Sequence, residues 1–551
     1  MKKIGFRNFR KFVDFPTINL GDVTYLVGQN NAGKSTMVKA MILLAENLTA
    51  KSGLPLGTEA FFHFDTPNYN LHINTFDDAL NFDALDKTIT FKAQIGIFDF
   101  QISVQPADDE NLYNHMQMKT DRIAPISRVI VEDSLHGISV TIYPFQQRYE
   151  VDFRSNEWAD ISSVEEINST LKIIRREHRN AVAHGDQMAA ASLLLEIEQL
   201  KSKRDLMKRT QNQNVGVGKA ILHSLPMTYS NGYESMPLIA REIMALADFA
   251  SHVNLSRPTE SILAMEMNRS EMSQQRDSIR LLKDHSKDLR MMARQINAVL
   301  SSIDITYIQA HLANQEKALV PRLNHSDEFA KAVEKYMLNT ARYDRDGVIK
   351  RFLLKWMDEK HFNIGKDFKI IEEEEFPGIY KANVLTFNDH WVNVADMGMG
   401  SNQLMILLVQ IANSIQKART RRAEYLIQHE EAPQSSPTII IEEPEQNLHP
   451  MLQSFLADLF YELATDYSMQ LIIETHSEYI IRKTQLIVAR EKYKNQSDVE
   501  MNNAQTVYYF PDSKPPYKME YNEKGLFTND FDRGFFDEAG NSAIKLMTGD
   551  I

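Results

Sequence analysis

One stretch near the amino terminus, GQNNAGKST, constrains the fold of this chain more than any other feature. It has the spacing Gly28-x4-Gly33-Lys34-Ser35, and it lies between an apolar run that predicts a strand (VTYLV) and a pattern that predicts a helix (STMVKAMILLAENL). A glycine-rich loop in this setting surrounds a phosphate with backbone N–H groups, and the helix amino terminus adds partial positive charge. Lys34 then reaches the β and γ oxygens of a nucleoside triphosphate, and the Ser35 hydroxyl ligates Mg²⁺. The residues expected to contact the nucleotide are Gly28, Asn30, Asn31, Ala32, Gly33, Lys34, Ser35 and Thr36.

A second apolar run ends on two adjacent carboxylates. Residues 437–450 read PTIIIEEPEQNLHP, and three consecutive isoleucines are typical of a strand buried on both faces. Taken alone, the stretch is explained equally well by a strand that exits into solvent. With a phosphate loop in the same chain, Glu442 is expected to hold Mg²⁺ through water, and Glu443 to polarise the attacking water as a general base. Most ATPases of this design have aspartate at the first position, so Glu442 departs from the common pattern.

Two further stretches complete the predicted site. The strand pattern QLIIE leads to His476, and a histidine at such a strand end can contact the γ-phosphate and sense its presence, although a lone histidine is more often structural. The stretch VADMGMGSNQLMILLVQIANSI predicts a turn of small residues that opens an apolar helix and offers an anion site at the helix start. The members of this turn, called the signature turn below, are Gly398, Gly400, Ser401, Asn402 and Gln403.

The composition limits the chemistry that can accompany these motifs. The 551 residues include no cysteine, which excludes disulfides, thiolate zinc sites and cysteine nucleophiles. The formal net charge is −13, so bulk electrostatics would not draw the protein to nucleic acid, and any such contact must come from a local basic patch. No apolar stretch approaches the length of a membrane span, and MKKIGFRNFR at the start lacks an apolar signal segment. We expect a cytoplasmic protein.

The order of the motifs resembles that of the ABC-type ATPase heads of SMC-like DNA-repair proteins and OLD-family nucleases. The stretches that carry this resemblance are GQNNAGKST, MGMGSNQ, IIIEEPEQNLHP and ETHSEYI. It implies two heads that dimerise around two ATP molecules, with Ser401 to Gln403 of one head covering the γ-phosphate bound to the other. It also implies that Glu445 to His449 lie at the dimer interface. The signature turn departs from the family's Leu-Ser-Gly-Gly-Gln pattern.

A narrower resemblance begins at about residue 307. The stretches YIQAHLANQEKAL, FLLKWMDEKHFNIGKDF and DFDRGFFDEAGNSAIKLM look like the Septu-type antiphage ATPases (the PtuA group), some of which act as retron effectors. This resemblance implies a homodimer or higher homo-oligomer in the bacterial cytoplasm that works with a separate HNH-type nuclease. DNA or RNA, including retron-derived nucleic acid, is a further candidate partner. Only 75 residues (551 − 476) follow His476, too few for another nuclease domain, so we expect any cutting group on another chain.

Together the patterns predict an α/β fold: an ABC-type P-loop ATPase head, with a mixed sheet, flanking helices and an antiparallel β subdomain, interrupted by an all-α insertion. Alternating residues from about 85 to 153 predict the antiparallel sheet, and apolar residues at helical spacing from about 160 to 300 predict the insertion. The predicted domains are 1–155 for the N-terminal lobe, 156–305 for the insertion and 306–551 for the C-terminal lobe. The family's glutamine-bearing loop is expected before or within the antiparallel sheet, at no particular residue.

Two other interpretations stay open. The chain could be a DNA-repair ATPase that acts as a structural clamp. It could instead be a ribonuclease, because HRNAVAHGD resembles the Arg-x4-His site of HEPN ribonucleases, in which Arg179 would steady a phosphate and His184 would exchange a proton with a ribose hydroxyl. A solvated helix with incidental charges explains that motif as well. The basic clusters KIIRREHR, KSKRDLMKR and KARTRRAEY are candidate contacts to a phosphate backbone, although solvated helix faces explain them too.

Overall fold

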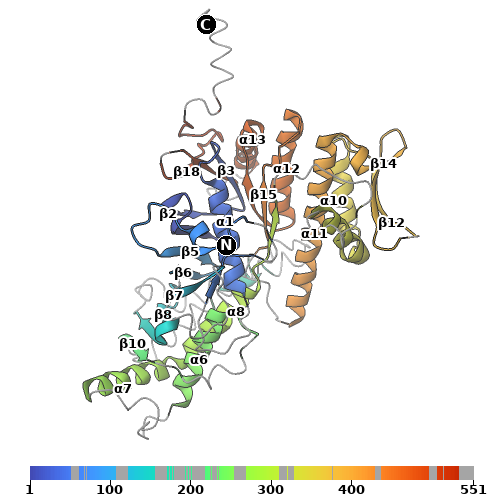
Figure 1. The fold of residues 1–551 in the computed structure, drawn as a ribbon. Coiled ribbons are helices and arrows are strands. Elements are labelled where there is room, and N and C mark those ends of the chain that lie inside the picture. Colours follow the sequence, from blue (N-terminus) through green and yellow to red (C-terminus); the bar gives the residue numbers. More distant parts are fainter. Residues whose placement is uncertain are drawn as a thin grey trace, which may run out of the picture. The chain divides into compact units, whose positions relative to one another are not determined.

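Figure 1 shows the computed structural model of the chain, which consists of two compact units. Unit 1 consists of Met1–Asn19, Thr36–Ile303 and Ala432–Ser435, and unit 2 of Leu20–Ser35, Asp304–Glu431 and Ser436–Ile551. The structure describes residues 1–50, 61–66, 69, 71–106, 122–154, 218–223, 225, 233, 235–253, 269–309, 319, 328–374, 376–428, 436–494, 505–512, 514–532 and 536, with scattered positions between 171 and 201.

A six-stranded sheet forms the centre of unit 2. Its order is β11-β15-β16-β3-β17-β18, in which the first five strands are parallel and β18 runs antiparallel to β17. The bounds are β3 Val23–Gly28, β11 Ile305–Ile308, β15 Thr438–Glu442, β16 Gln470–Glu474, β17 Gln505–Phe510 and β18 Tyr517–Met519. Every residue of β3 is buried, and so are the isoleucines of β15, as their apolar runs predict. The strand before the phosphate loop and the acidic strand are therefore confirmed as members of one mixed sheet.

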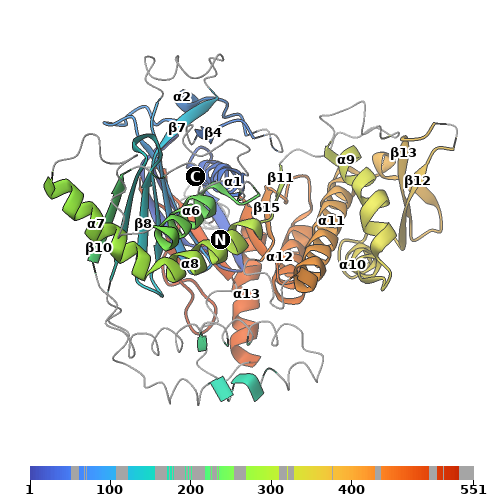
Figure 2. The ribbon, with the colours of Figure 1, turned by 90° about the horizontal axis from the view of Figure 1, so that it is seen from below.

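Helices pack with this sheet into a single core. They are α9 Glu328–Lys335, α10 Val348–Met357, α11 Met399–Gln428, α12 Pro450–Asp466 and α13 Glu478–Lys494. The core contains Trp356 of α10, Leu404 of α11 and Phe460 of α12, all of them at most 1 % exposed. In Figure 2, α10 and α11 lie next to each other. In the part of the chain that the structure describes, no helix is both long and apolar enough to cross a membrane.

A small antiparallel sheet, in the order β12-β13-β14, precedes the signature turn in unit 2. Its strands are β12 Asp367–Glu372, β13 Tyr380–Leu385 and β14 Trp391–Asn393. A π-helical turn, η4 Tyr336–Ala341, follows α9, and a 3₁₀ turn, η5 Val394–Asp396, leads toward α11. The predicted return to strands before the signature turn is thus present.

Unit 1 is built on an antiparallel sheet in the order β10-β9-β8-β7-β6-β5-β1-β2, with β4 paired to β7. The bounds are β1 Lys3–Phe9, β2 Phe12–Asn19, β4 Phe61–His63, β5 Ile89–Ile95, β6 Phe98–Val104, β7 Ile123–Asp133, β8 Ile138–Tyr143, β9 Arg148–Phe153 and β10 Gly218–His223. A 3₁₀ turn, η1 Pro144–Gln146, joins β8 to β9. Buried residues alternate with more exposed ones along β5, β8 and β9, which is the pattern that predicted this sheet. The predicted α/β fold is confirmed.

The helices of unit 1 include the one predicted after the phosphate loop. The helices are α1 Lys34–Thr49, whose first two residues belong to unit 2, α2 Phe76–Ala79, α6 Leu238–His252, α7 Arg269–Asp284 and α8 Ser286–Ser301. Helices α6 and α8 lie side by side (Figure 2).

The insertion at 156–305 is not helical throughout, which corrects the all-α prediction for it. Residues 218–223 form β10, which pairs antiparallel with β9 and so extends the sheet by one strand. Ala220 and Leu222 of β10 are fully buried at alternate positions. In the sequence, this short alternation of apolar residues lies within a long stretch in which apolar residues at helical spacing predict helices.

Candidate functional site

The candidate site lies at one edge of the unit 2 sheet, where three parallel strands end together. β16 separates β3 from β15, and Glu474 of β16 is in register with Glu442 of β15 on one side and with Leu26 of β3 on the other. Because parallel strands end at the same edge, the carboxylates of Glu442 and Glu474 and the phosphate loop after β3 are brought together. Sequence spacing predicted Glu442 at this edge but not Glu474.

The backbone of the phosphate loop requires its glycines. A side chain at Gly28 would place its Cβ 2.3 Å from the carbonyl oxygen of Phe510 in β17, a distance that neither backbone can absorb. Gly33 has φ +102°, and Asn31 also adopts a left-handed conformation with φ +61°. Asn30 and Asn31 are exposed, whereas Ala32 is buried. These left-handed positions and the close approach at Gly28 are typical of the main chain of a phosphate-binding loop.

Lys34 and Ser35 open helix α1 and lie against Glu474. The Lys34 ammonium donates hydrogen bonds to the carbonyl oxygens of Gly28 at 3.1 Å and Gln29 at 2.9 Å, and its nitrogen is 3.9 Å from Glu474 Oε1. The Ser35 hydroxyl donates a 2.9 Å hydrogen bond to the same carboxylate oxygen. The two side chains expected to bind phosphate and Mg²⁺ thus share one acidic neighbour.

Glu474, which is buried, and Glu442, which is half-buried, form an acidic pair. Burial and, second, the charge of Glu442 raise the pKa of Glu474 to about 7, against the opposing effects of Lys34 and Ser35. Burial, together with the charge of Glu442 and a hydrogen bond to it, raises the pKa of the Tyr307 hydroxyl on β11. Tyr307 therefore fixes Glu442 from the far side of β15.

This acidic pair suits a magnesium ion that keeps phosphate and water ligands. Among the described residues there is no cluster of three or more histidine, aspartate or glutamate side chains that could hold a metal by themselves. Mg²⁺ commonly takes one or two carboxylates plus substrate phosphates and waters, and a hydroxyl beside two carboxylates fits that requirement. Glu474 Oε2 is buried and has no hydrogen-bond partner in the protein, so it can accept one from outside.

Glu443 and His476 come close to each other next to this pair. Glu443 adopts a left-handed backbone with φ +45°, and its N–H donates to the Glu474 carbonyl oxygen at 2.8 Å. Its carboxylate accepts a hydrogen bond from Gln446 and lies 4.0 Å from His476 Nε2. Burial and the charge of Lys34 lower the pKa of His476, while Glu443 opposes them. Such strain at a charged residue is typical of functional sites.

The loop after Glu443 packs against the signature turn of the same chain. A Cβ at Gly400 would lie 2.9 Å from the Asn447 carbonyl oxygen, and Asn447 Nδ2 donates to Gln403 Oε1 at 3.2 Å. Asn402 and Gln403 are buried, whereas Ser401 is half-buried and Gly398 is exposed. Within the turn, Gly398 and Ser401 are therefore the members most open to a ligand.

Two residues between the acidic strand and α12 have roles within the chain. Buried Glu445 accepts a 2.6 Å hydrogen bond from the His476 backbone N–H, and so ties the acidic strand's loop to the end of β16. The exposed His449 caps α12 by accepting from the Met451 N–H at 3.3 Å. Their expected place at a dimer interface stays a prediction.

Glu474 is a site residue that the sequence-based prediction did not include. Its signal in the sequence is an acidic residue at the end of an apolar strand, two positions before His476. Gln309 follows β11 directly, beside the strand that carries Glu442. The glutamine-bearing loop, expected before or within the antiparallel sheet, stays a prediction.

Other predicted contact residues lie elsewhere. Arg179 and His184 are outside the described residues, so the ribonuclease hypothesis stays a prediction. Of the basic cluster on α11, Arg419 pairs with Asp346 at 2.5 Å, and Arg421 pairs with Asp304 at 3.1 Å. These pairs explain the cluster by contacts within the chain.

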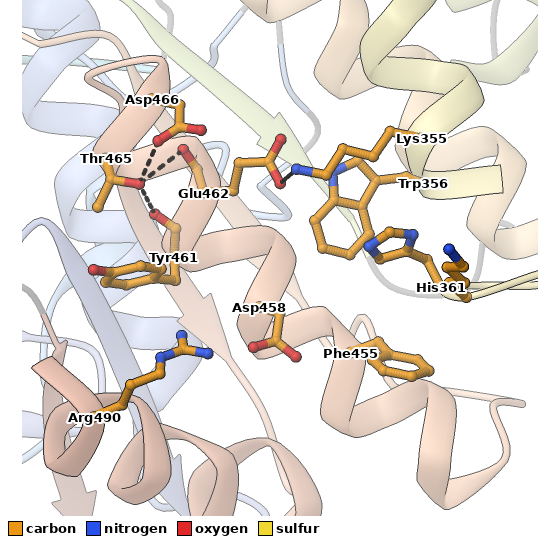
Figure 3. A pocket seen from close by; sticks show the side chains of 11 residues that line it. Lys355, Trp356, His361, Phe455, Asp458, Tyr461, Glu462, Thr465, Asp466 and Arg490 are labelled. Atoms are coloured by element: carbon orange, nitrogen blue, oxygen red, sulfur yellow. Dashed lines mark hydrogen bonds and ion pairs between the residues drawn. The ribbon is translucent and has the colours of Figure 1, made fainter. Parts of the chain in front are cut away.

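A separate hollow of about 370 Å³ in unit 2 is no part of this site. Figure 3 shows its lining, which includes Lys355, Trp356, Glu462 and Arg490. Lys355 Nζ is 2.6 Å from Glu462 Oε2, so opposite charges are already paired there. No residue of the phosphate loop or of the acidic strand lines it.

Comparison with known proteins agrees with the chemistry of the sheet edge. A family model described as AAA ATPase domain matches residues 1–481. The chain belongs to the AAA ATPase domain family. The prediction of a P-loop ATPase that binds ATP is thereby confirmed at the level of the family, and we refer to the chain below as the AAA ATPase.

Three solved structures of Smc heads resemble the AAA ATPase weakly. An Smc head domain of Pyrococcus furiosus with an extended coiled coil, bound to the C-terminal domain of ScpA, is 11% identical with a TM-score of 0.29, and the match covers 100% of this chain and 98% of that one. An Smc head with a coiled coil and joint from Pyrococcus yayanosii is 12% identical, with a TM-score of 0.32 and coverage of 95% and 97%. An SmcHead bound to the C-winged helix domain of ScpA is 13% identical, with a TM-score of 0.27 and coverage of 94% and 97%. No curated protein matches the chain.

Proposed function

We propose that the AAA ATPase binds ATP with Mg²⁺ at the edge of the unit 2 sheet and hydrolyses it there. The observation that carries this proposal is that Lys34 and Ser35 both contact Glu474, which lies in register with Glu442, at the carboxyl ends of the three neighbouring parallel strands β3, β16 and β15. Lys34 would bind the β and γ phosphates, and Ser35 and Glu442 would hold the cation. Bound Mg²⁺ would neutralise phosphate charge. Glu443 would orient and deprotonate the attacking water, and His476, kept neutral by its lowered pKa, would contact the γ-phosphate.

The proposal includes dimerisation that depends on ATP. The exposed Gly398 and half-buried Ser401 at the start of α11 offer a helix amino terminus and a hydroxyl to a phosphate on a second copy. Asn447 of the loop after Glu443 bonds to Gln403 of the signature turn, so a rearrangement on hydrolysis at Glu443 can reach the turn through that contact. Gln309 is the residue we assign to the glutamine-bearing loop, because it follows the strand next to β15.

We further propose that the ATP state of this assembly regulates a separate HNH-type nuclease in antiphage defence in the bacterial cytoplasm. The support is the resemblance of the C-terminal half to the Septu-type ATPases, in stretches such as FLLKWMDEKHFNIGKDF. DNA or RNA would then contact the assembly or the nuclease. A clamp ATPase of the SMC-like type is the second candidate, because the order of motifs is common to both.

The first test is purification of the AAA ATPase together with its native genomic neighbours in ATP and Mg²⁺, with bound proteins identified by mass spectrometry and bound nucleic acid extracted. An HNH-type protein that stays bound supports the nuclease partnership. A homo-oligomer with no protein partner contradicts it and supports the clamp. RNA cleavage that is lost in His184→Ala while ATP turnover persists would instead place the nuclease in this chain.

A further inference from the structure

The direction of the hydrogen bond between Ser35 and Glu474 determines whether the lone pairs of the Ser35 hydroxyl oxygen are available to a cation. The Ser35 hydroxyl donates its hydrogen to Glu474 Oε1 at 2.9 Å. A hydroxyl has one hydrogen and two lone pairs, so a hydrogen committed to Glu474 leaves the oxygen lone pairs to face elsewhere. A serine that ligates a metal must present those lone pairs, and a carboxylate that accepts its hydrogen holds it in that orientation. Partners behind a metal ligand commonly orient it in this way.

The second carboxylate oxygen of Glu474, Oε2, is placed to contact the hydration shell of a bound cation. Glu474 ends β16, between β15, which carries Glu442, and β3, which leads into the phosphate loop, and the residue is 5 % exposed. Oε1 accepts from Ser35, but Oε2 is buried without a hydrogen-bond partner in the protein. An unpaired carboxylate oxygen in a buried site is costly, and a water carried by a cation supplies the missing donor. Glu474 thus has one oxygen for the serine and one for the metal's hydration shell.

We propose that Glu474 is a positioning residue of the cation site, which fixes the Ser35 hydroxyl and accepts a hydrogen bond from a metal-bound water. It would thereby set the affinity of the AAA ATPase for the divalent cation that accompanies ATP. This inference rests on the proposed function. It gives the nucleotide site three acidic side chains with distinct tasks: Glu442 and Glu474 for the cation, and Glu443 for the attacking water.

A purely structural role makes a different prediction. Glu474 also lies 3.9 Å from the Lys34 ammonium, so it could simply hold the phosphate loop in shape. In that case its replacement would weaken nucleotide binding with and without metal to the same extent. If Glu474 acts on the cation, its replacement weakens binding of the metal and leaves metal-free nucleotide binding almost unchanged.

The test measures Mn²⁺ binding by electron paramagnetic resonance in the full-length protein, with the hydrolysis-resistant analogue AMP-PNP, and binding of fluorescent mant-ATP in EDTA. Glu474→Gln keeps the size of the side chain and an acceptor for Ser35 but removes the charge. We expect its Mn²⁺ half-saturation to rise by about tenfold or more, as for loss of other partners behind metal ligands. Mant-ATP affinity in EDTA should change by less than about threefold, because Lys34 and the loop backbone remain.

Controls separate the possible outcomes. Glu478→Gln removes a carboxylate on α13 that is half-exposed and bonded to Arg482, and it should leave both measurements unchanged. In a double-mutant cycle, Glu474→Gln should add less Mn²⁺ loss in a Ser35→Ala background than in the parent, because only the contact through the metal-bound water is then left to weaken. Glu474→Asp, which keeps the charge on a shorter arm, serves as a second variant if Glu474→Gln fails to fold.

A Mn²⁺ half-saturation within twofold of the parent value in Glu474→Gln overturns the inference. So does an equal loss of mant-ATP binding in EDTA, which would assign Glu474 to support of the loop. Failure of the parent protein to bind mant-ATP at all would overturn the proposed function instead, and that measurement is made first.

Discussion

Two buried glutamates of the AAA ATPase, one in each unit, have similarly raised pKa values for partly different reasons. Burial raises the pKa of both Glu474 in unit 2 and Glu242 in unit 1 to about 7. Each accepts a hydrogen bond from a hydroxyl group, Glu474 from Ser35 at 2.9 Å and Glu242 from Tyr149 at 2.7 Å. The shift of the pKa alone does not distinguish them.

The charged and polar groups around Glu474 and Glu242 do distinguish the two glutamates. Glu474 has a second carboxylate, Glu442, in register on the next strand, which raises its pKa further, and Lys34 and Ser35 only partly oppose this. For Glu242, the hydrogen bond from Tyr149 and the charge of Arg241 both lower the pKa against the effect of burial. A raised carboxylate pKa therefore reports burial, whereas a second carboxylate in register at a strand end points to a cation site.

The largest expected effect comes from a substitution in the site that contains Glu474. Lys34→Ala removes the cation that would bind the β and γ phosphates, and charge-assisted hydrogen bonds of this kind contribute up to about 3 kcal/mol each. We expect mant-ATP affinity to fall by about 100-fold or more. Lys355→Ala, at an exposed ion pair with Glu462, should leave the affinity unchanged. Equal affinity in Lys34→Ala and the parent would show that the loop at residues 28–36 is not the nucleotide site.

The second prediction separates ATP hydrolysis from ATP binding at the same edge of the unit 2 sheet. Glu443→Gln removes the proposed general base, so steady-state phosphate release should slow by about 100-fold or more while ATP stays bound. Light scattering after gel filtration in ATP and Mg²⁺ should then show an accumulated dimer. Hydrolysis at the parent rate in this variant would mean that Glu443 does not activate the water.

How much of this site the sequence predicts depends on whether its signal is local. The spacing of Gly28, Gly33, Lys34 and Ser35 is a local pattern, and so is an apolar strand that ends at Glu442; both appear in the structure as predicted. That Glu474 lies between them follows from the strand order, which pairing of distant segments determines. The local pattern of either strand does not identify its neighbour in the sheet.

The neighbour of β3 on its other side shows the same limit. Residues 505–519 have the local pattern of a closing hairpin, and β17 and β18 do form one. β17 also pairs in parallel with β3, and its Phe510 is the reason that Gly28 has no room for a side chain. The strand β10 was missed for a related reason, because six alternating residues gain their meaning only beside β9.

The third prediction concerns Glu242 and the dependence of stability on pH. Its folded pKa of about 7 lies above the ordinary value of 4.5, so between these values the folded state holds a proton that the unfolded state has lost. The free energy of unfolding should therefore fall as pH rises from 4.5 to 7, by up to about 3 kcal/mol in total, and level off above that. Glu242→Gln keeps an acceptor for Tyr149 and removes this decline.

Urea unfolding of unit 1, followed between pH 5 and 8, measures the effect as the difference between the variant and the parent. Glu242→Gln should gain stability relative to the parent as the pH rises. Glu132→Gln, at a surface ion pair with Arg154, provides the matched control and should follow the parent. Parallel pH profiles for Glu242→Gln and the parent would show that another group causes the decline.

The smallest effect concerns a third buried carboxylate, Asp304, which has two cations instead of a second acid. Its oxygens lie 2.5 Å from Lys417 Nζ and 3.1 Å from Arg421 Nη1, and its side chain is 7 % exposed.

Because both partners are partly exposed, water compensates part of the loss, and Asp304→Asn should lower the free energy of unfolding by about 1–2 kcal/mol. Asp346→Asn, at the more exposed pair with Arg419, should leave the free energy of unfolding almost unchanged. Neither should change mant-ATP affinity, because a carboxylate with its charges balanced inside the chain has no need of an external cation. If Asp304→Asn weakened nucleotide binding while the protein stayed folded, the comparison would fail. The presence of cationic partners would then not tell a structural carboxylate from the acidic pair at the end of β15 and β16.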